Sequence, residues 1–137
     1  MTRKGESEQE IPPVSLLIAR EAMEIASEAC NVTLHEMQAP KRKRAKVSFA
    51  RQLAMYLCHV VGQMSLSDIS ALFGRDRTTV AYACHIIEDR RDSPFFNAQL
   101  EYMETAMRER TIEALARARM RPIRQRDIRR IRKSLMR

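Results

Sequence analysis

Apolar residues recur every three or four positions along most of this 137-residue chain, which is the spacing of amphipathic helices. The first such helix is expected over residues 14–30. A short helical turn over residues 33–37 should follow, because Thr33 and Glu36 have the spacing of a capping box. Pro40 would end this turn, because proline cannot continue a helix.

Two more helices are expected between residues 48 and 74. Ser48 is a candidate N-cap for a helix that Gly62 would end, with apolar residues at helical spacing between them. Either Ser65 or Ser67 would cap a shorter helix, and Gly74 would close that helix and turn the chain.

Two long helices are expected in the rest of the chain. Asp76 or Thr78 would open the first of them. Ser93 and Pro94 form a cap and first-turn signal for the second, which would continue to about residue 120 before Pro122 stops it. With only three glycines and no tryptophan in the chain, the pattern predicts an all-α fold: a helical bundle containing a helix-turn-helix, with a basic C-terminal tail.

The same pattern divides the chain into four segments. Residues 1–13 are polar and end in two prolines, so they are interpreted as a flexible leader. Residues 14–40 form an N-terminal helical segment, residues 41–116 the central domain, and residues 117–137 a basic extension.

The formal net charge of +8 is unevenly distributed. Residues 41–51 contain six basic and no acidic side chains, and residues 117–137 contain ten basic and one acidic. The chain before residue 117 therefore has a net charge of −1. Positive charge confined to one loop and one tail indicates two places where a polyanion such as nucleic acid would bind.

The two helices expected over residues 67–73 and 78–91, joined through Gly74, would form a helix-turn-helix. An apolar stripe on the second helix consists of Val80, Ala83, Cys84 and Ile87. If this stripe faces the core, a step of about 100° per residue directs Thr78, Tyr82, His85 and Asp89 outward. The exposed face would begin with Arg75, Asp76 and Arg77. The N-terminal residues of such a helix are those that reach base edges in the major groove of DNA.

Several motifs in order carry a resemblance to a known family. They are KRKR at 41–44, A-R-Q-L-A-M at 50–55, S-L-S-D-I at 65–69, and G-R-D-R-T-T-V at 74–80, continued by Ala-Cys at 83–84 and Ile-Glu at 87–88. This series resembles the carboxy-terminal DNA-binding domain of the bacterial chromosomal replication initiator DnaA, from about residue 14 to residue 107.

The resemblance implies roles for particular residues on double-stranded DNA. Base contacts would be made by Asp76, Arg77, Thr78, Leu66 and Ser67. Phosphates would be held by Arg51, Gln52, Thr79 and Tyr82, and the adjacent minor groove would be entered by Arg42, Lys43 and Arg44.

This chain departs from the family pattern at three positions. One glycine precedes Arg75 where the family usually has two, Arg77 stands where histidine is typical, and Ser67 stands where proline is typical. Arginine offers a longer and permanently charged fork than histidine, so the recognised sequence is expected to differ. No G-x-x-x-x-G-K-[ST] nucleotide loop is present, so no origin melting by this chain alone is expected.

Other classes of function find little support in the sequence. No catalytic motif is found, and Glu101, Glu104 and Glu109 are interpreted as salt-bridged helix surface. The three cysteines are expected to be buried thiols in a reducing compartment, and no metal site, cofactor or membrane span is expected. The sequence therefore favours a non-enzymatic protein of the bacterial cytoplasm, associated with the nucleoid.

The leading hypothesis is a stand-alone transcriptional regulator with an initiator-like DNA-binding module. The alternatives are a replication modulator that competes with the initiator at its own sites, and an adaptor that binds a protein partner through the acidic N-terminal helix or the Met-rich last helix. The sequence leaves the oligomeric state open.

The basic extension leaves a further choice open. Ile128, Ile131 and Leu135 recur at helical spacing among arginines, so a helix would form either on DNA or on an anionic membrane. DNA is favoured, because the module already places a polyphosphate nearby.

Overall fold

The computed structural model describes residues 11–38, 45–120 and 125–136. Seven helices and no strand are found in these residues. They are α2 (Pro13–Cys30), α3 (Leu34–Gln38), α4 (Ala45–Val60), α5 (Leu66–Phe73), α6 (Arg77–Arg90), α7 (Pro94–Met120) and α8 (Gln125–Met136). The predicted all-α class with a helix-turn-helix is confirmed. The predicted leader lies almost wholly outside the described residues, as do residues 41–44.

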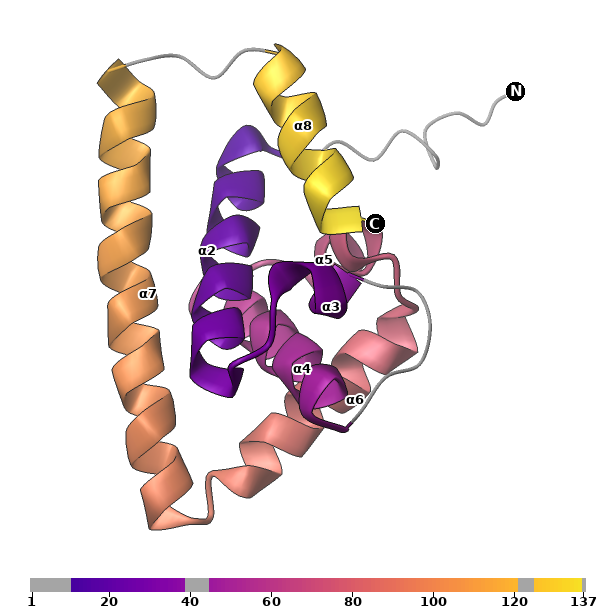
Figure 1. Cartoon of the computed structure of the whole chain (residues 1–137), viewed down its shortest axis with the longest axis vertical. Coiled ribbons are helices and arrows are strands. Elements are labelled where there is room, and N and C mark those ends of the chain that lie inside the picture. Colours follow the sequence, from indigo (N-terminus) through magenta and orange to yellow (C-terminus); the bar gives the residue numbers. More distant parts are fainter. Residues whose placement is uncertain (1–10, 39–44, 121–124, 137) are drawn as a thin grey trace.

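Helix α4 forms the centre of the core. All six residues from Leu53 to Cys58 are buried, which is the pattern of a helix surrounded by protein. Helices α2 and α6 pack against α4, and α7 runs along the far side of α2 (Figure 1). The N-terminal helix therefore contributes to the same core as the helix-turn-helix.

Two predicted helix caps are present in the structure. The Thr33 hydroxyl accepts a hydrogen bond from the Glu36 N–H (3.0 Å), and the Glu36 carboxylate accepts one from the Thr33 N–H (2.9 Å), which completes the capping box. Of the two serines proposed as the cap of α5, Ser65 has this role. Its hydroxyl accepts a hydrogen bond from the Asp68 N–H (3.0 Å).

The predicted start of the central helix is wrong. Helix α4 begins at Ala45, so Ser48 lies within its first turn instead of capping it. No glycine or proline interrupts residues 45–60, and Val47 is buried on the same side of the helix as Ala50 and Ala54. Burial of Val47 therefore favours a helix that is one turn longer than the cap signal indicated.

The predicted burial of all three thiols is also only partly correct. Cys58 is buried, whereas Cys30 and Cys84 are half-buried. Cys84 lies at the edge of the apolar stripe of α6, while Val80, Ala83 and Ile87 occupy its centre.

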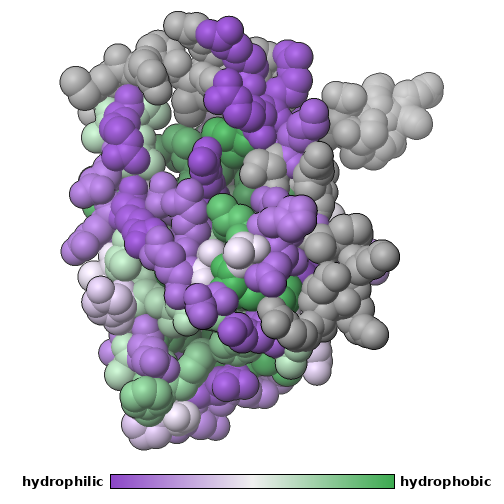
Figure 2. All heavy atoms as spheres, in the orientation of Figure 1, coloured by the Kyte–Doolittle hydropathy of each residue, from purple (hydrophilic) through white to green (hydrophobic). Residues whose placement is uncertain are grey.

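The face seen in Figure 2 is mainly hydrophilic, with a hydrophobic area near the start of α7 at the lower left. In that helix Phe95 and Tyr102 are 75% and 77% exposed, whereas Leu100, Met103 and Met107 face α2 and are buried. Helix α7 therefore has one apolar side that packs within the protein and exposed aromatic side chains on another side.

Candidate DNA-binding surface

A tight turn joins α5 to α6. Gly74 has φ of 65°, in the left-handed region that glycine adopts without strain, and its N–H bonds to the carbonyl of Ser70. A Cβ at Gly74 would meet no atom within 4 Å. The backbone conformation alone therefore accounts for glycine at this position, which sets the direction of α6.

Helix α6 presents the faces that the periodicity predicted. Val80, Ala83 and Ile87 are at most 1% exposed and pack toward α4 and α5. The opposite face consists of Thr78, Tyr82, His85 and Asp89, all of which are exposed. The core-facing stripe therefore holds the helix with a polar face directed to solvent.

The residues predicted to contact bases lie at the starts of α5 and α6. Asp76, Arg77 and Thr78 are exposed at the beginning of α6, and Leu66 and Ser67 are half-buried at the beginning of α5. Asp76 is the N-cap residue of α6, but its side chain makes no capping hydrogen bond. Its carboxylate is therefore not used by the helix itself. The first turn also has the positive end of the helix dipole, which attracts anions.

The residues predicted to hold phosphates come from two helices. Thr79 and Tyr82 are exposed on α6, whereas Arg51 and Gln52 are half-buried on α4. The Arg51 guanidinium donates a hydrogen bond to the carbonyl of Met37 (3.2 Å), which fixes part of its side chain. The predicted minor-groove residues Arg42, Lys43 and Arg44 lie outside the described residues.

Arg75 joins Arg51 at this surface, although the resemblance assigned it no contact. Burial lowers the pKa of Arg51, and the positive charge of Arg75 lowers it further. Within the described part of the chain, neither guanidinium pairs with a carboxylate. Two like charges held close together without an acidic partner form a favourable place for a phosphate.

A polar cluster anchors the other end of α6, and the sequence did not indicate it. The Arg91 guanidinium donates to the Glu104 carboxylate and to the Tyr56 hydroxyl, both at 2.8 Å, and to the Asn97 side chain at 2.6 Å. The Tyr56 hydroxyl in turn donates to Glu88 (2.8 Å). The cluster joins α4, α6 and α7.

Glu104 corrects the interpretation of the α7 carboxylates as surface residues, because it is only 7% exposed. A signal for this burial was present in the sequence. Leu100, Met103, Glu104 and Met107 share one apolar stripe at helical spacing, so an acid at that register requires a partner.

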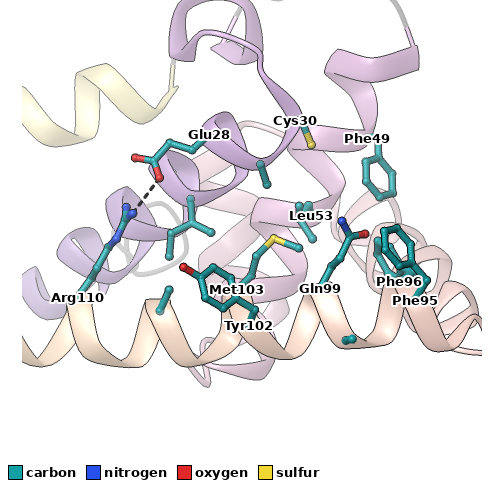
Figure 3. A pocket seen from close by; sticks show the side chains of 14 residues that line it. Glu28, Cys30, Phe49, Leu53, Phe95, Phe96, Gln99, Tyr102, Met103 and Arg110 are labelled. Carbon is teal, nitrogen blue, oxygen red and sulfur yellow. Dashed lines mark hydrogen bonds and ion pairs between the residues drawn. The ribbon is translucent and has the colours of Figure 1, made fainter.

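A cavity lies between α2, α4 and α7. This cavity has a volume of about 620 Å³ and is lined mainly by apolar and aromatic side chains, among them Phe49, Phe96, Tyr102 and Met103 (Figure 3). At one end of it the Arg110 guanidinium pairs with the Glu28 carboxylate at 2.8 Å. Among the residues that the structure describes, none of the predicted DNA contacts lines this cavity.

Metal-ligand geometry, thiol ionisation and membrane-spanning length are the features of the described residues that bear on other classes of function. No group of three histidine, cysteine or acidic side chains is placed to hold a metal ion in this part of the chain. Burial raises the pKa of the Cys84 thiol to about 11 and that of Cys58 further, so both are protonated at neutral pH. None of the helices described is long and apolar enough to cross a membrane.

The paired helices α5 and α6, with a buried stripe and an exposed N-terminal face, define a helix-turn-helix protein of the DNA-binding class. Residues 20–87 match the family model described as bacterial dnaA protein helix-turn-helix. This segment of the chain therefore belongs to that family, as its motifs indicated.

Three curated relatives align with this part of the chain, all named chromosomal replication initiator protein DnaA. The relative from Mycobacteroides abscessus is 44% identical over 61 residues, which are 44% of this chain and 12% of that protein. The relative from Picosynechococcus sp. is 43% identical over 63 residues, 45% of this chain and 14% of that protein. The relative from Lachnoclostridium phytofermentans is 32% identical over 83 residues, 59% of this chain and 18% of that protein. The chain thus spans less than a fifth of the length of these relatives.

Proposed function

We propose that this protein binds double-stranded DNA in a sequence-specific way, with the start of α6 in the major groove. The observation that carries this proposal is the exposure of Asp76, Arg77 and Thr78 on a helix whose opposite face is buried. This helix lies within the segment that matches the DnaA helix-turn-helix.

Each of the three exposed residues has a chemical partner in the groove. The Arg77 guanidinium is suited to the two acceptors of a guanine, and the Asp76 carboxylate accepts from the amino group of a cytosine. The Thr78 methyl group packs on the methyl group of a thymine. These contacts would specify sequence, with Leu66 and Ser67 of α5 beside them.

Phosphate contacts would position the module on the duplex. Arg51 and Arg75 would supply two cations, of which Arg75 is near enough to lower the pKa of Arg51. Gln52, Thr79 and Tyr82 would supply hydrogen-bonding groups. Contacts of this kind carry no sequence information but fix the register of the helix in the groove.

Substitutions in α6 test the proposed reading of bases. Arg77→Ala or Thr78→Ala should weaken binding to the preferred duplex by about 1–3 kcal/mol, because each removes a base contact. Arg108→Ala and Thr105→Ala are matched controls, since both residues are exposed on α7, far from the start of α6 (Figure 1). Equal losses on preferred and scrambled duplexes would show that the α6 residues hold only the backbone.

We further propose that the protein regulates transcription in the bacterial cytoplasm as a binding protein and not as an enzyme. The names of the relatives favour an alternative role that also depends on DNA binding. In this role the protein would compete with a replication initiator for the initiator's own sites. Mapping the bound sites across the genome distinguishes the two roles. Enrichment at promoters supports regulation, enrichment at the replication origin supports competition, and the absence of enrichment contradicts both.

The aromatic hollow beside α7 favours one additional role, the binding of a protein partner. The Met-rich face of α7 offers little surface to such a partner, because Met107 is fully buried and Met103 is only 9% exposed at the wall of the cavity. The exposed Phe95 and Tyr102 at the rim of the cavity would make the contact instead. Pull-down with Tyr102→Glu beside the unchanged protein tests this role, and equal capture by both proteins would contradict it.

A further inference from the structure

Helix α8 has an apolar and a basic face on opposite sides. Leu135 is 5% exposed, and Ile128 and Ile131 are half-buried against the core. Exposed cations lie on the rest of its surface: Arg126, Arg129 and Lys133 on the opposite side and Arg132 beside the apolar face.

The protein itself covers the apolar face. Helix α8 packs on α2, α3 and α5, so Ile128, Ile131 and Leu135 meet the core. A basic amphipathic helix binds a membrane by burying its apolar face among the lipids. Here that would require α8 to leave the core, whereas the basic face is already free to meet a polyanion.

The four cations named above are exposed to solvent. Among the side chains that the structure describes, no acidic partner is found for Arg126, Arg129, Arg132 or Lys133. Like charges three or four residues apart on a helix repel one another. A row of phosphates would remove this repulsion.

Helix α8 is placed beside the helix-turn-helix. It packs on α5, and its C-terminal end lies next to α3 and α5 (Figure 1). Helix α5 begins with Leu66 and Ser67, which belong to the predicted DNA contacts. Hydrophilic residues gather over the outer side of α8 (Figure 2).

We propose that α8 is a second phosphate-binding surface, which grips the same DNA duplex beside the site that α6 reads. This inference rests on the proposed function. It lies outside the segment that matches the DnaA family, which ends at residue 87. Because the surface touches only phosphates, it should strengthen binding to every duplex and leave the preferred sequence unchanged.

Three substitutions test the surface. In the full chain, Arg126→Gln, Arg129→Gln and Lys133→Gln are combined, since these side chains point away from the core. A matched control combines Arg20→Gln, Arg90→Gln and Arg108→Gln, which removes the same charge from exposed positions of α2, of the C-terminal end of α6 and of α7. Circular dichroism and thermal melting should show that both variants keep the fold.

The measurement is the dissociation constant for a preferred and a scrambled duplex at several salt concentrations. Removing one phosphate contact should reduce the slope of log affinity against log salt by about 0.9. Suppose that the three substitutions remove two such contacts. The ratio of the dissociation constant of the α8 variant to that of the unchanged protein should then fall by about twelvefold between about 0.05 and 0.2 M salt. The control variant should keep the slope of the unchanged protein.

Two results would overturn the inference. One is the same salt slope for the α8 variant and the unchanged protein on both duplexes. The other is an unchanged DNA slope with loss of binding to vesicles of phosphatidylglycerol and phosphatidylcholine, which would assign the surface to membranes. If the unchanged protein binds DNA and Arg77→Ala weakens that binding, either result rejects α8 alone and the proposed function stands. If the unchanged protein does not bind duplex DNA, the proposed function fails first.

Discussion

Removing Arg91 should destabilise the protein strongly, because its partner is nearly buried. The Arg91 and Glu104 side chains are 20% and 10% exposed, and their charged atoms are 2.8 Å apart. Arg91→Met would leave the Glu104 carboxylate in the protein interior without its cation, and the Tyr56 and Asn97 side chains without a donor. Breaking a buried ion pair in this way costs about 3–5 kcal/mol. Since Arg91 retains some contact with water, the free energy of unfolding is expected to fall by about 3 kcal/mol, the lower end of this range.

A second ion pair of the same length supplies the control. Arg110 and Glu28 also meet at 2.8 Å, but their side chains are 35% and 63% exposed. Arg110→Met should therefore cost less than about 1 kcal/mol, as is usual for surface pairs. Distance alone does not distinguish the two pairs, so a difference in stability would arise from burial.

Urea denaturation followed by circular dichroism measures both variants. With a slope of about 2 kcal/mol per molar urea, Arg91→Met should lower the midpoint by about 1.5 M, and Arg110→Met by less than about 0.5 M. The double substitution Arg91→Met with Glu104→Leu should recover much of the loss, because well-packed apolar residues often replace a buried pair without cost. Equal, small shifts for Arg91→Met and Arg110→Met would refute the argument from burial.

Three further predictions concern α6 and the turn before it. Ile87→Ala should lower the free energy of unfolding by about 2–5 kcal/mol, because Ile87 is fully buried, and an unchanged melting temperature would mean that α6 is rotated. Gly74→Ala should lower the free energy of unfolding by about 1–2 kcal/mol in the same urea experiment, because alanine is strained in the left-handed backbone conformation of Gly74. An unchanged free energy of unfolding would contradict this explanation. Because burial raises the pKa of Cys84 to about 11, less of this thiol is ionised at pH 8 than of an ordinary cysteine. Its alkylation by iodoacetamide, followed by mass spectrometry, should therefore keep accelerating up to about pH 11, whereas a plateau near pH 9 would contradict the shift.

The helices and the exposed face of α6 could be predicted because both depend on local spacing. The stripe containing Val80, Ala83 and Ile87 fixes the rotation of α6, and this alone places Thr78 and Tyr82 in solvent. The start of α4 was missed because a serine in a first turn has the same appearance in sequence as a serine that caps a helix.

Contacts between distant segments could not be predicted. The Tyr56–Arg91 hydrogen bond joins residues 35 positions apart, and no local pattern relates them. The sequence also showed that α8 would be amphipathic but not what its apolar face would meet. Only the packing of α8 on α2, α3 and α5 determines which face remains available.

The most direct test of the central claim is selection of bound sequences from a library of random DNA duplexes, carried out with the unchanged protein, with Arg77→Ala and with Arg108→Ala. The unchanged protein and Arg108→Ala are expected to enrich the same sequence. Arg77→Ala should relax the preference at one base pair, because the side chain that discriminates there is absent. Failure of the unchanged protein to enrich any sequence, or an identical preference for Arg77→Ala, would contradict the claim that the start of α6 reads DNA.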